Sequence, residues 1–381
     1  SFGDGAEGEG DRDMIEGFGL LLGMIIGAGT FALPFGFEKA GLGRSLALFG
    51  FVFLISWILH LLYAAIIYST PGRHRFPGYV GRFLGINAER AALFFTFFGS
   101  WGAMLAYGVL GGVFLETIFG VSAFMGGLIF FVAGGFLFFL PLKSVGRANF
   151  YLTLPLLVFI LVLAWELAPA VNVENFASSG SSDWFLLYGI LLFAFGGYSA
   201  LPGFHDVLGA NSRALSKKII FASLFIAAVF YLIFIFVIWG ASGPNATPDA
   251  FLGLGKTAGR GITMVGSLIG ILAVFTSYVV FGADLKLTFR YDYRIPETFS
   301  WLIAFLPPVF LFWLGFTNLV KILSLVGSVG LGVFAVFILL ISWKKRGELS
   351  SFLGFTPRLW WLLPLGILVV LGALQDVFSL I

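Results

Sequence analysis

The sequence contains no cysteine and few charged residues. The missing cysteine excludes disulfide bonds, thiolate metal sites and cysteine nucleophiles. Only 11% of the residues are charged, against about 25% in a typical soluble domain, so the chain lacks the charge that covers a water-exposed surface. It is instead 59% hydrophobic, with 48 Phe residues. This composition is typical of a protein whose outer surface faces lipid.

Long apolar stretches recur along the whole chain. A helix needs about 20 predominantly apolar residues to cross the hydrocarbon core of a bilayer. Eleven stretches of roughly this length are present, and they run over Met14–Phe37, Ser45–Tyr68, Ala91–Phe119, Val121–Leu142, Phe150–Leu167, Trp184–Leu208, Ile219–Trp239, Thr263–Phe281, Phe299–Phe316, Ile322–Trp343 and Leu359–Leu380. The sequence therefore predicts an all-α membrane protein with 11 transmembrane helices.

The positions of Lys and Arg predict the orientation of these helices, because cytoplasmic loops are enriched in both residues. With the N-terminus inside, 17 of the 22 Lys and Arg residues fall in cytoplasmic segments and 5 fall outside. We therefore expect a multi-pass protein of the plasma or inner membrane. Its N-terminus would be cytoplasmic and its C-terminus external.

An internal repeat predicts how the chain is divided. GTFALP at Gly29–Pro34 recurs as GYSALP at Gly197–Pro202, 168 residues later. Five helices separate the copies, so the second copy enters the membrane from the opposite side, as in the inverted repeats of many transporters. The Gly- and acid-rich start is expected to be disordered, with no cleavable signal peptide. The expected division is a tail over 1–13, a first repeat over 14–168, an inverted second repeat over 184–343 and a last helix over 357–381.

Both copies of the repeat interrupt a helix that should cross the membrane. Glycine weakens a helix and proline removes a backbone donor, and irregular backbone at membrane depth is tolerated where it is buried in protein or lines a cavity. Each break exposes the amide end of one half-helix and the carbonyl end of the other. A zwitterion would use both, with its carboxylate at the amides of Ala28, Gly29 and Thr30 and its ammonium at carbonyls near Ile26, Phe193, Ala194 and Phe195.

Two further expectations concern these breaks. Thr30 and Ser199 are residue types that cap helix N-termini, and we expect them to cap the two half-helices. Close helix packing is an alternative explanation of the first break, because Gly19, Gly23 and Gly27 recur at four-residue spacing. The paired break in FAFGGYSALPGFHD favours the binding-site interpretation.

Several motifs resemble those of the amino acid–polyamine–organocation transporter superfamily. IIGAGTFALP and FAFGGYSALPGF are similar to its helices 1 and 6. GSWGAMLAYGVLGG and FTSYVVFGADLKLTFRYDYRIP resemble helices 3 and 8 of its amino acid/auxin permease branch and of hydroxy and aromatic amino acid permeases. The resemblance implies a LeuT-type fold with five plus five inverted helices and one extra helix. It also implies an amino acid substrate, which Ser100, Ala103, Tyr107, Gly196 and Tyr198 would face together with the two breaks.

The resemblance implies coupling to Na⁺ or H⁺. By motif position, a sodium site would use the carbonyls of Gly23 and Ile26 and the hydroxyls of Thr276 and Ser277. The alternative is that both hydroxyls bond their own helix. Proton coupling needs a titratable group at depth, and the candidates are Glu116, Glu166, Asp206, Asp284, His60 and His205. The absence of lysine from the expected helix 5 favours Na⁺.

The proposed pocket contains no charged residue, which predicts a neutral amino acid, hydrophobic or aromatic. Motifs of membrane-embedded enzymes and channel filters are absent, so an enzyme or a channel is not expected. Apart from Na⁺ no cofactor is expected, and the expected partners are the amino acid and the lipid bilayer, with no nucleic acid. A proton-coupled symporter without a sodium site and an amino acid sensor on a transporter fold stay open. The inner loop over 69–85 predicts either a short gating helix or a basic loop that contacts anionic lipid.

Overall fold

The protein is almost entirely helical. The computed structural model describes residues 4–177, 184–209, 212–256 and 259–378, and no strand occurs within these ranges. The helices of the first half are α1 Asp4–Ile25, α2 Ala28–Ala40, α3 Leu42–Tyr68, α4 Phe76–Leu84, α5 Ile86–Phe119, α6 Ala123–Phe136 and α7 Leu142–Leu167. Those of the second half are α8 Trp184–Ala194, α9 Ala200–Leu208, α10 Arg213–Ser242, α11 Gly259–Asp292, α12 Glu297–Trp313, α13 Leu319–Leu325, α14 Gly332–Lys344, α15 Arg346–Leu353 and α16 Leu359–Phe378.

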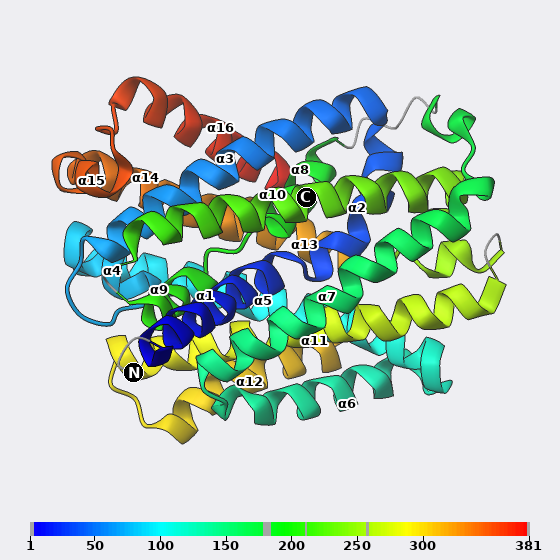
Figure 1. Cartoon of the computed structure of the whole chain (residues 1–381), viewed down its shortest axis with the longest axis horizontal. Helices are drawn as coiled ribbons and strands as arrows, with labels where there is room; N and C mark the ends of the chain where they lie inside the picture. The colour runs from blue at the N-terminus through cyan, green and yellow to red at the C-terminus, as the bar shows by residue number, and fades with distance from the viewer. Residues whose placement is uncertain (1–3, 178–183, 210–211, 257–258, 379–381) are drawn as a thin grey trace.

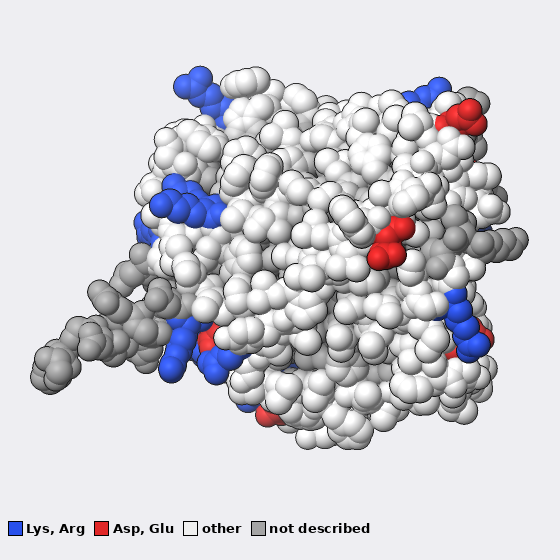
Figure 2. Space-filling model, turned by 45° about the vertical axis from the view of Figure 1, so that its right-hand side comes forward, with Lys and Arg blue, Asp and Glu red and all other residues white. Residues whose placement is uncertain are grey.

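The helices form a bundle of membrane-spanning dimensions. Most of the long helices run roughly along the longest axis of the molecule (Figure 1). Within the described ranges, seven are long and apolar enough to cross a membrane, and four shorter apolar helices lie over Ala123–Phe139, Trp184–Ala194, Glu297–Trp313 and Leu359–Gln375. On the face shown in Figure 2, most charged side chains lie toward the two ends of the molecule, and a broad uncharged surface separates them.

Two helices are broken where the sequence predicts a break. α1 ends at Ile25 and α2 begins at Ala28, while α8 ends at Ala194 and α9 begins at Ala200. A third irregularity has no counterpart in the sequence analysis, because α13 continues through one π-helical segment, Val326–Leu331, into α14.

The start of the chain differs from the expected disordered tail. α1 begins at Asp4, so helix covers most of residues 1–13, and residues 1–3 lie outside the described ranges.

Glycine allows α1 to approach α7 closely. A Cβ added at Gly19 would lie 2.8 Å from the backbone nitrogen of Phe150, and one added at Gly23 would lie 2.8 Å from Cβ of Asn149. The close-packing explanation therefore holds for Gly19 and Gly23, while Gly27 lies at the break itself. α2 packs against α8, and α1 against α9, so the two breaks lie side by side.

Candidate functional site

The first break places polar backbone in a buried position. Ile26 and Gly27 separate α1 from α2, and the Gly27 amide donates to the carbonyl of Ile25 at 2.9 Å. Gly27 is the N-cap of α2, so Thr30 lies inside the helix and the predicted cap at Thr30 is wrong. α2 begins two residues before Thr30, at Ala28. The first amides of a helix have no preceding helical carbonyl to which they can donate.

The second break is longer and includes five residues, Phe195 to Ser199. The Gly196 amide donates to the carbonyl of Phe193 at 3.0 Å, and the Ala200 amide donates to that of Gly197 at 3.2 Å. Ser199 occupies the predicted N-cap position of α9, although its side chain makes no capping hydrogen bond. The turn leaves the carbonyl end of α8 and the amide end of α9 facing the same region.

The two breaks lie against each other. A Cβ added at Gly29 would lie 2.7 Å from Cα of Ala194, so only glycine fits where α2 begins beside the end of α8. The hydroxyl of Tyr231, on α10, lies 2.6 Å from the carbonyl oxygen of Ile25 and 2.8 Å from that of Ala194. One side chain therefore joins the carbonyl ends of both interrupted helices.

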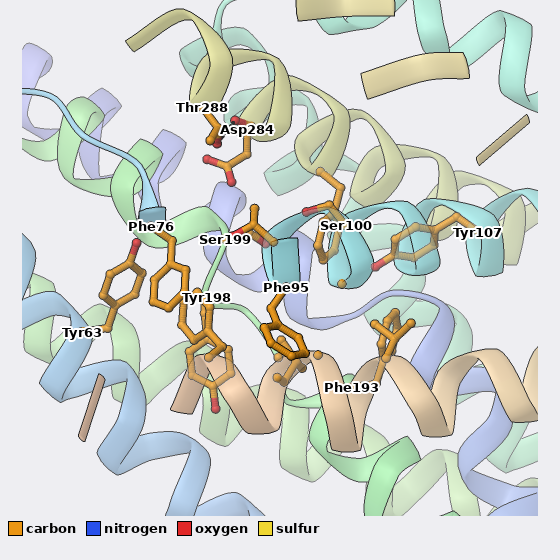
Figure 3. Close-up of a pocket in the computed structure, with 18 residues that line it drawn as sticks. Tyr63, Phe76, Phe95, Ser100, Tyr107, Phe193, Tyr198, Ser199, Asp284 and Thr288 are labelled. Atoms are coloured by element: carbon orange, nitrogen blue, oxygen red, sulfur yellow. Dashed lines mark hydrogen bonds between the residues drawn. The ribbon is translucent and has the colours of Figure 1, made fainter. Parts of the chain in front are cut away.

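A cavity extends from the second break toward α4 (Figure 3). Tyr107 of α5 and Phe193 lie near one end of it, and Tyr63 and Phe76 lie near the other. Asp284 and Thr288 of α11 add polar groups that the substrate prediction did not include. The π-helical segment also lines the cavity, through Val326, Gly330 and Leu331.

The structure brings part of the predicted substrate site together. Six predicted residues line the cavity: Ser100, Tyr107, Phe193, Gly196, Tyr198 and Ser199. Seven others lie outside its lining: Ile26, Ala28, Gly29, Thr30, Ala103, Ala194 and Phe195. The first break is one side chain behind the cavity wall, because a Cβ added at Gly27 would lie 2.8 Å from the hydroxyl oxygen of Tyr107. Phe195 points away and packs against Phe49, with ring centroids 5.2 Å apart.

A buried arginine closes the end of the cavity near α4. The side chain of Arg75 is 1% exposed, and its guanidinium lies 3.0 Å from Asp284 and 3.1 Å from Asp206 of α9. Burial lowers the pKa of Arg75, but the two carboxylates outweigh this effect and raise the pKa overall, so the guanidinium stays charged. This ion-pair network joins the loop before α4 to both α9 and α11.

Two further contacts hold α4 in place. Asp292 accepts hydrogen bonds from the backbone amides of Arg75 and Gly78, at 3.1 and 3.2 Å, and so caps the N-terminus of α4. Phe76 stacks on Phe334 of α14 with ring centroids 3.7 Å apart. The loop over 69–85 thus contains a short helix, Phe76–Leu84, which is one of the two forms predicted for it, and Phe76 of this helix lines the cavity.

The predicted ion-site residues are partly assembled. The Ser277 hydroxyl, on α11, lies 2.6 Å from the carbonyl oxygen of Gly23 on α1 and 3.1 Å from that of Ala273 in its own helix. The Thr276 hydroxyl donates to the carbonyl of Ala273 in its own helix at 3.0 Å, as the alternative explanation predicts. Asn149 of α7 lies beside Gly23, and neither atom of its buried amide has a hydrogen-bond partner among the described residues.

The proton-coupling candidates have different surroundings. Asp206 and Asp284 share Arg75. His60 is buried, with its Nδ1 atom 2.7 Å from the carbonyl oxygen of Ser56 and its ring 4.2 Å from that of Tyr198. Glu116 and Glu166 do not line the cavity.

Solved structures share this fold. The structure of MhsT in complex with L-phenylalanine superposes with a TM-score of 0.75 at 16% identity, covering 95% of this chain and 98% of that one. A mutant of the Eremococcus coleocola manganese transporter superposes with a TM-score of 0.70 at 12% identity, covering 97% and 86%. The broken helices and these similarities define the chain as a protein of the LeuT-type transporter fold.

The family follows from the sequence itself. The family model described as transmembrane amino acid transporter protein matches residues 11–341. The chain therefore belongs to this family, within the amino acid–polyamine–organocation superfamily, and is a multi-pass membrane protein. Among curated proteins, no significant match is found.

Proposed function

We propose that this protein is a secondary active transporter that carries a neutral amino acid across the membrane by alternating access. The observation that supports it most strongly is the meeting of two broken helices, joined by Tyr231, beside a cavity in the centre of the bundle. Free amide ends attract a carboxylate and free carbonyl ends attract an ammonium group. The zwitterion of an α-amino acid carries both groups, an ammonium and a carboxylate, on the same carbon atom.

The same proposal includes the finer architecture. Eleven membrane crossings would form two inverted repeats over 14–168 and 184–343, followed by a last helix over 357–381. The N-terminus would be cytoplasmic, so the cavity would be closed toward the cytoplasm by Arg75 and by the stack of Phe76 on Phe334. Release of the substrate inside would then require Arg75 to leave Asp206 or Asp284.

The lining of the cavity supports a substrate with a hydrophobic or aromatic side chain. Phe95, Phe193 and Phe281 supply apolar surface, and Ser100 and Ser199 supply hydroxyls. Asp284, the charged residue in this lining, is already paired with Arg75 and so does not demand a cationic substrate. L-Phenylalanine is the ligand of MhsT, which has the same fold.

The proposed coupling ion is Na⁺, and the residues beside Gly23 fit it. A hard cation is bound by carbonyl, amide and hydroxyl oxygens. The Ser277 hydroxyl meets the Gly23 carbonyl at 2.6 Å. The side chain of Asn149 packs beside Gly23, and its amide oxygen has no partner among the described residues. Na⁺ would supply the charge that links α1 to α7 and α11, with Asn149 replacing Thr276 in the predicted set.

Proton coupling is the second candidate, and it rests on Asp284. This carboxylate lines the cavity and is 3.0 Å from Arg75, so a proton on Asp284 would weaken the contact that closes the inner end.

Uptake by proteoliposomes separates these possibilities. The purified protein would be given a panel of labelled amino acids under an imposed Na⁺ gradient or an imposed pH gradient. Accumulation of a neutral amino acid under the Na⁺ gradient supports the proposal, and accumulation under the pH gradient alone supports the second candidate. If no amino acid accumulates under either gradient, while one still binds, the protein is a sensor rather than a transporter.

A further inference from the structure

A second pocket lies outside the cavity, beside the ion-pair network of Arg75. It has a volume of about 270 Å³ and is bounded by the loop before α4, the start of α7, and parts of α9, α11 and α12. Four basic residues line it, Arg73, Lys143, Lys286 and Arg290, against two acidic residues, Asp206 and Glu297. The lining therefore carries an excess of two positive charges.

The acidic residues of this pocket are shared among several cations. One oxygen of Glu297 lies 2.8 Å from the ammonium of Lys286 and 3.1 Å from the guanidinium of Arg290. Asp206 lies 3.8 Å from Arg73 but 3.1 Å from Arg75, which lies outside the pocket. Lys143 pairs with Asp13 at 2.7 Å. Counting Asp13 and Asp284, which pair with Lys143 and Arg75, five cations face four carboxylates, so one positive charge is not balanced.

The most buried of these cations is Lys286. Its side chain is 5% exposed, and its ammonium lies 4.6 Å from the ring centre of Phe139. Lys286 and Arg290 are four residues apart on α11, so they project from the same face of the helix. A buried ammonium beside a guanidinium is a suitable partner for a phosphate oxygen.

We propose that this pocket binds a phosphate group. The apolar part of its lining, Phe138, Leu140, Pro141 and Leu142, lies beside the cations and would contact the apolar portion of a phosphate-bearing molecule. The phosphate comes from an anionic phospholipid headgroup or from a soluble phosphate compound. Either source would draw Arg73 away from Asp206 and connect the loop before α4 to α11.

The test uses the full chain purified from membranes. In one arm, the protein in phosphatidylcholine nanodiscs receives a minor fraction of phosphatidylglycerol, and the retained phosphatidylglycerol is counted by mass spectrometry. In the other arm, inorganic phosphate replaces chloride at equal ionic strength, and the shift in Tm is measured. The double variant Lys286→Gln/Arg290→Gln should weaken binding about 30-fold, because each basic residue near a membrane surface strengthens the binding of an anionic group roughly fivefold.

Two controls make the result decisive. The swapped variant Lys286→Arg/Arg290→Lys keeps both charges and should keep binding, which separates loss of the site from loss of the fold. Arg213→Gln/Lys218→Gln removes two exposed cations of α10 and should leave binding unchanged. Binding in the lipid arm assigns the headgroup, and binding in the phosphate arm alone assigns a soluble ligand. If neither probe binds, or if the control variant loses as much binding as the pocket variant, the proposal is overturned.

Discussion

At the scale of single residues, Tyr231 holds the two breaks together. A tyrosine hydroxyl has one proton, so it satisfies only one of the carbonyls of Ile25 and Ala194 at a time. The Ile25 carbonyl also accepts from the Gly27 amide at 2.9 Å. The Ala194 carbonyl is therefore the one that is available to a substrate ammonium when Tyr231 donates to Ile25.

Tyr231→Phe should reduce stability by about 1–3 kcal/mol, because a buried carbonyl loses its donor. It should also reduce uptake. Tyr278→Phe is the matched control, since Tyr278 is equally buried but its hydroxyl makes one contact of 3.5 Å, to the carbonyl of Phe131. Thermal unfolding in detergent measures both variants, and equal losses would contradict the role given to Tyr231.

Gly29→Leu should abolish uptake without preventing membrane insertion, because even a Cβ at this position lies 2.7 Å from Cα of Ala194. Gly50→Leu is the control, because a Cβ there meets no atom within 4 Å. Uptake assays and the yield of monodisperse protein check both variants. Uptake like that of the wild type in Gly29→Leu would show that the contact between α2 and α8 is not needed for transport.

Ser277→Ala should raise the Na⁺ concentration needed for half-maximal uptake by roughly tenfold, the equivalent of about one hydrogen bond or ligand contact. Thr276→Ala should have a smaller effect, since Thr276 bonds to its own helix. Removing both hydroxyls should lower Na⁺ dependence at least as much as Ser277→Ala. Uptake measured against Na⁺ concentration decides this, and uptake that never depends on Na⁺ would reject the ion assignment.

At the scale of elements, α4 and the loop before it would form the closure of the proposed transport cycle. Arg75 reaches α9 and α11 at once, and Asp292 of α11 caps α4. α9 follows one break and α11 carries Ser277, so the network spans elements that a transport cycle would move apart. Closure at this end therefore depends on one buried cation.

Arg75→Gln should reduce stability by about 3 kcal/mol, because it leaves two largely buried carboxylates without their partner. In a Ser199→Cys background, which supplies the cavity with a thiol, it should also make that thiol accessible to reagents from the side of α4. Arg73→Gln is the control, since the side chain of Arg73 is 69% exposed and its contact with Asp206 is 3.8 Å long. Unchanged stability and accessibility in Arg75→Gln would show that α4 is held by Asp292 and by apolar packing alone.

The breaks were predictable from sequence, and a short helix was one of the two predictions for the loop over 69–85. The ion pairs that hold this helix were not predictable. Gly27, Gly29 and Pro34 mark the first break because their backbone chemistry is local. The pair of Arg75 and Asp284 joins residues 209 positions apart, and no local pattern reports such a contact. Asn149 was missed because the apolar stretch used to place the helix begins at Phe150, while α7 begins at Leu142.

At the scale of the whole molecule, the apolar stretches predicted the helical architecture and the motifs predicted the family. The π-helical segment Val326–Leu331 was not predicted, and it packs against α8, which lies far from it in the sequence. The proposed function requires that an amino acid binds between the two broken helices and is released by opposite movements of the inner and outer ends.

The absence of natural cysteine makes a direct test possible, because Ser199→Cys introduces a unique thiol into the cavity lining. The measurement is the rate at which a thiol reagent alkylates this variant in proteoliposomes. The account predicts that an amino acid the protein transports slows alkylation several-fold, while an amino acid it does not transport has no effect. If a transported amino acid leaves the rate unchanged, the substrate does not bind at the second break and the central claim is contradicted.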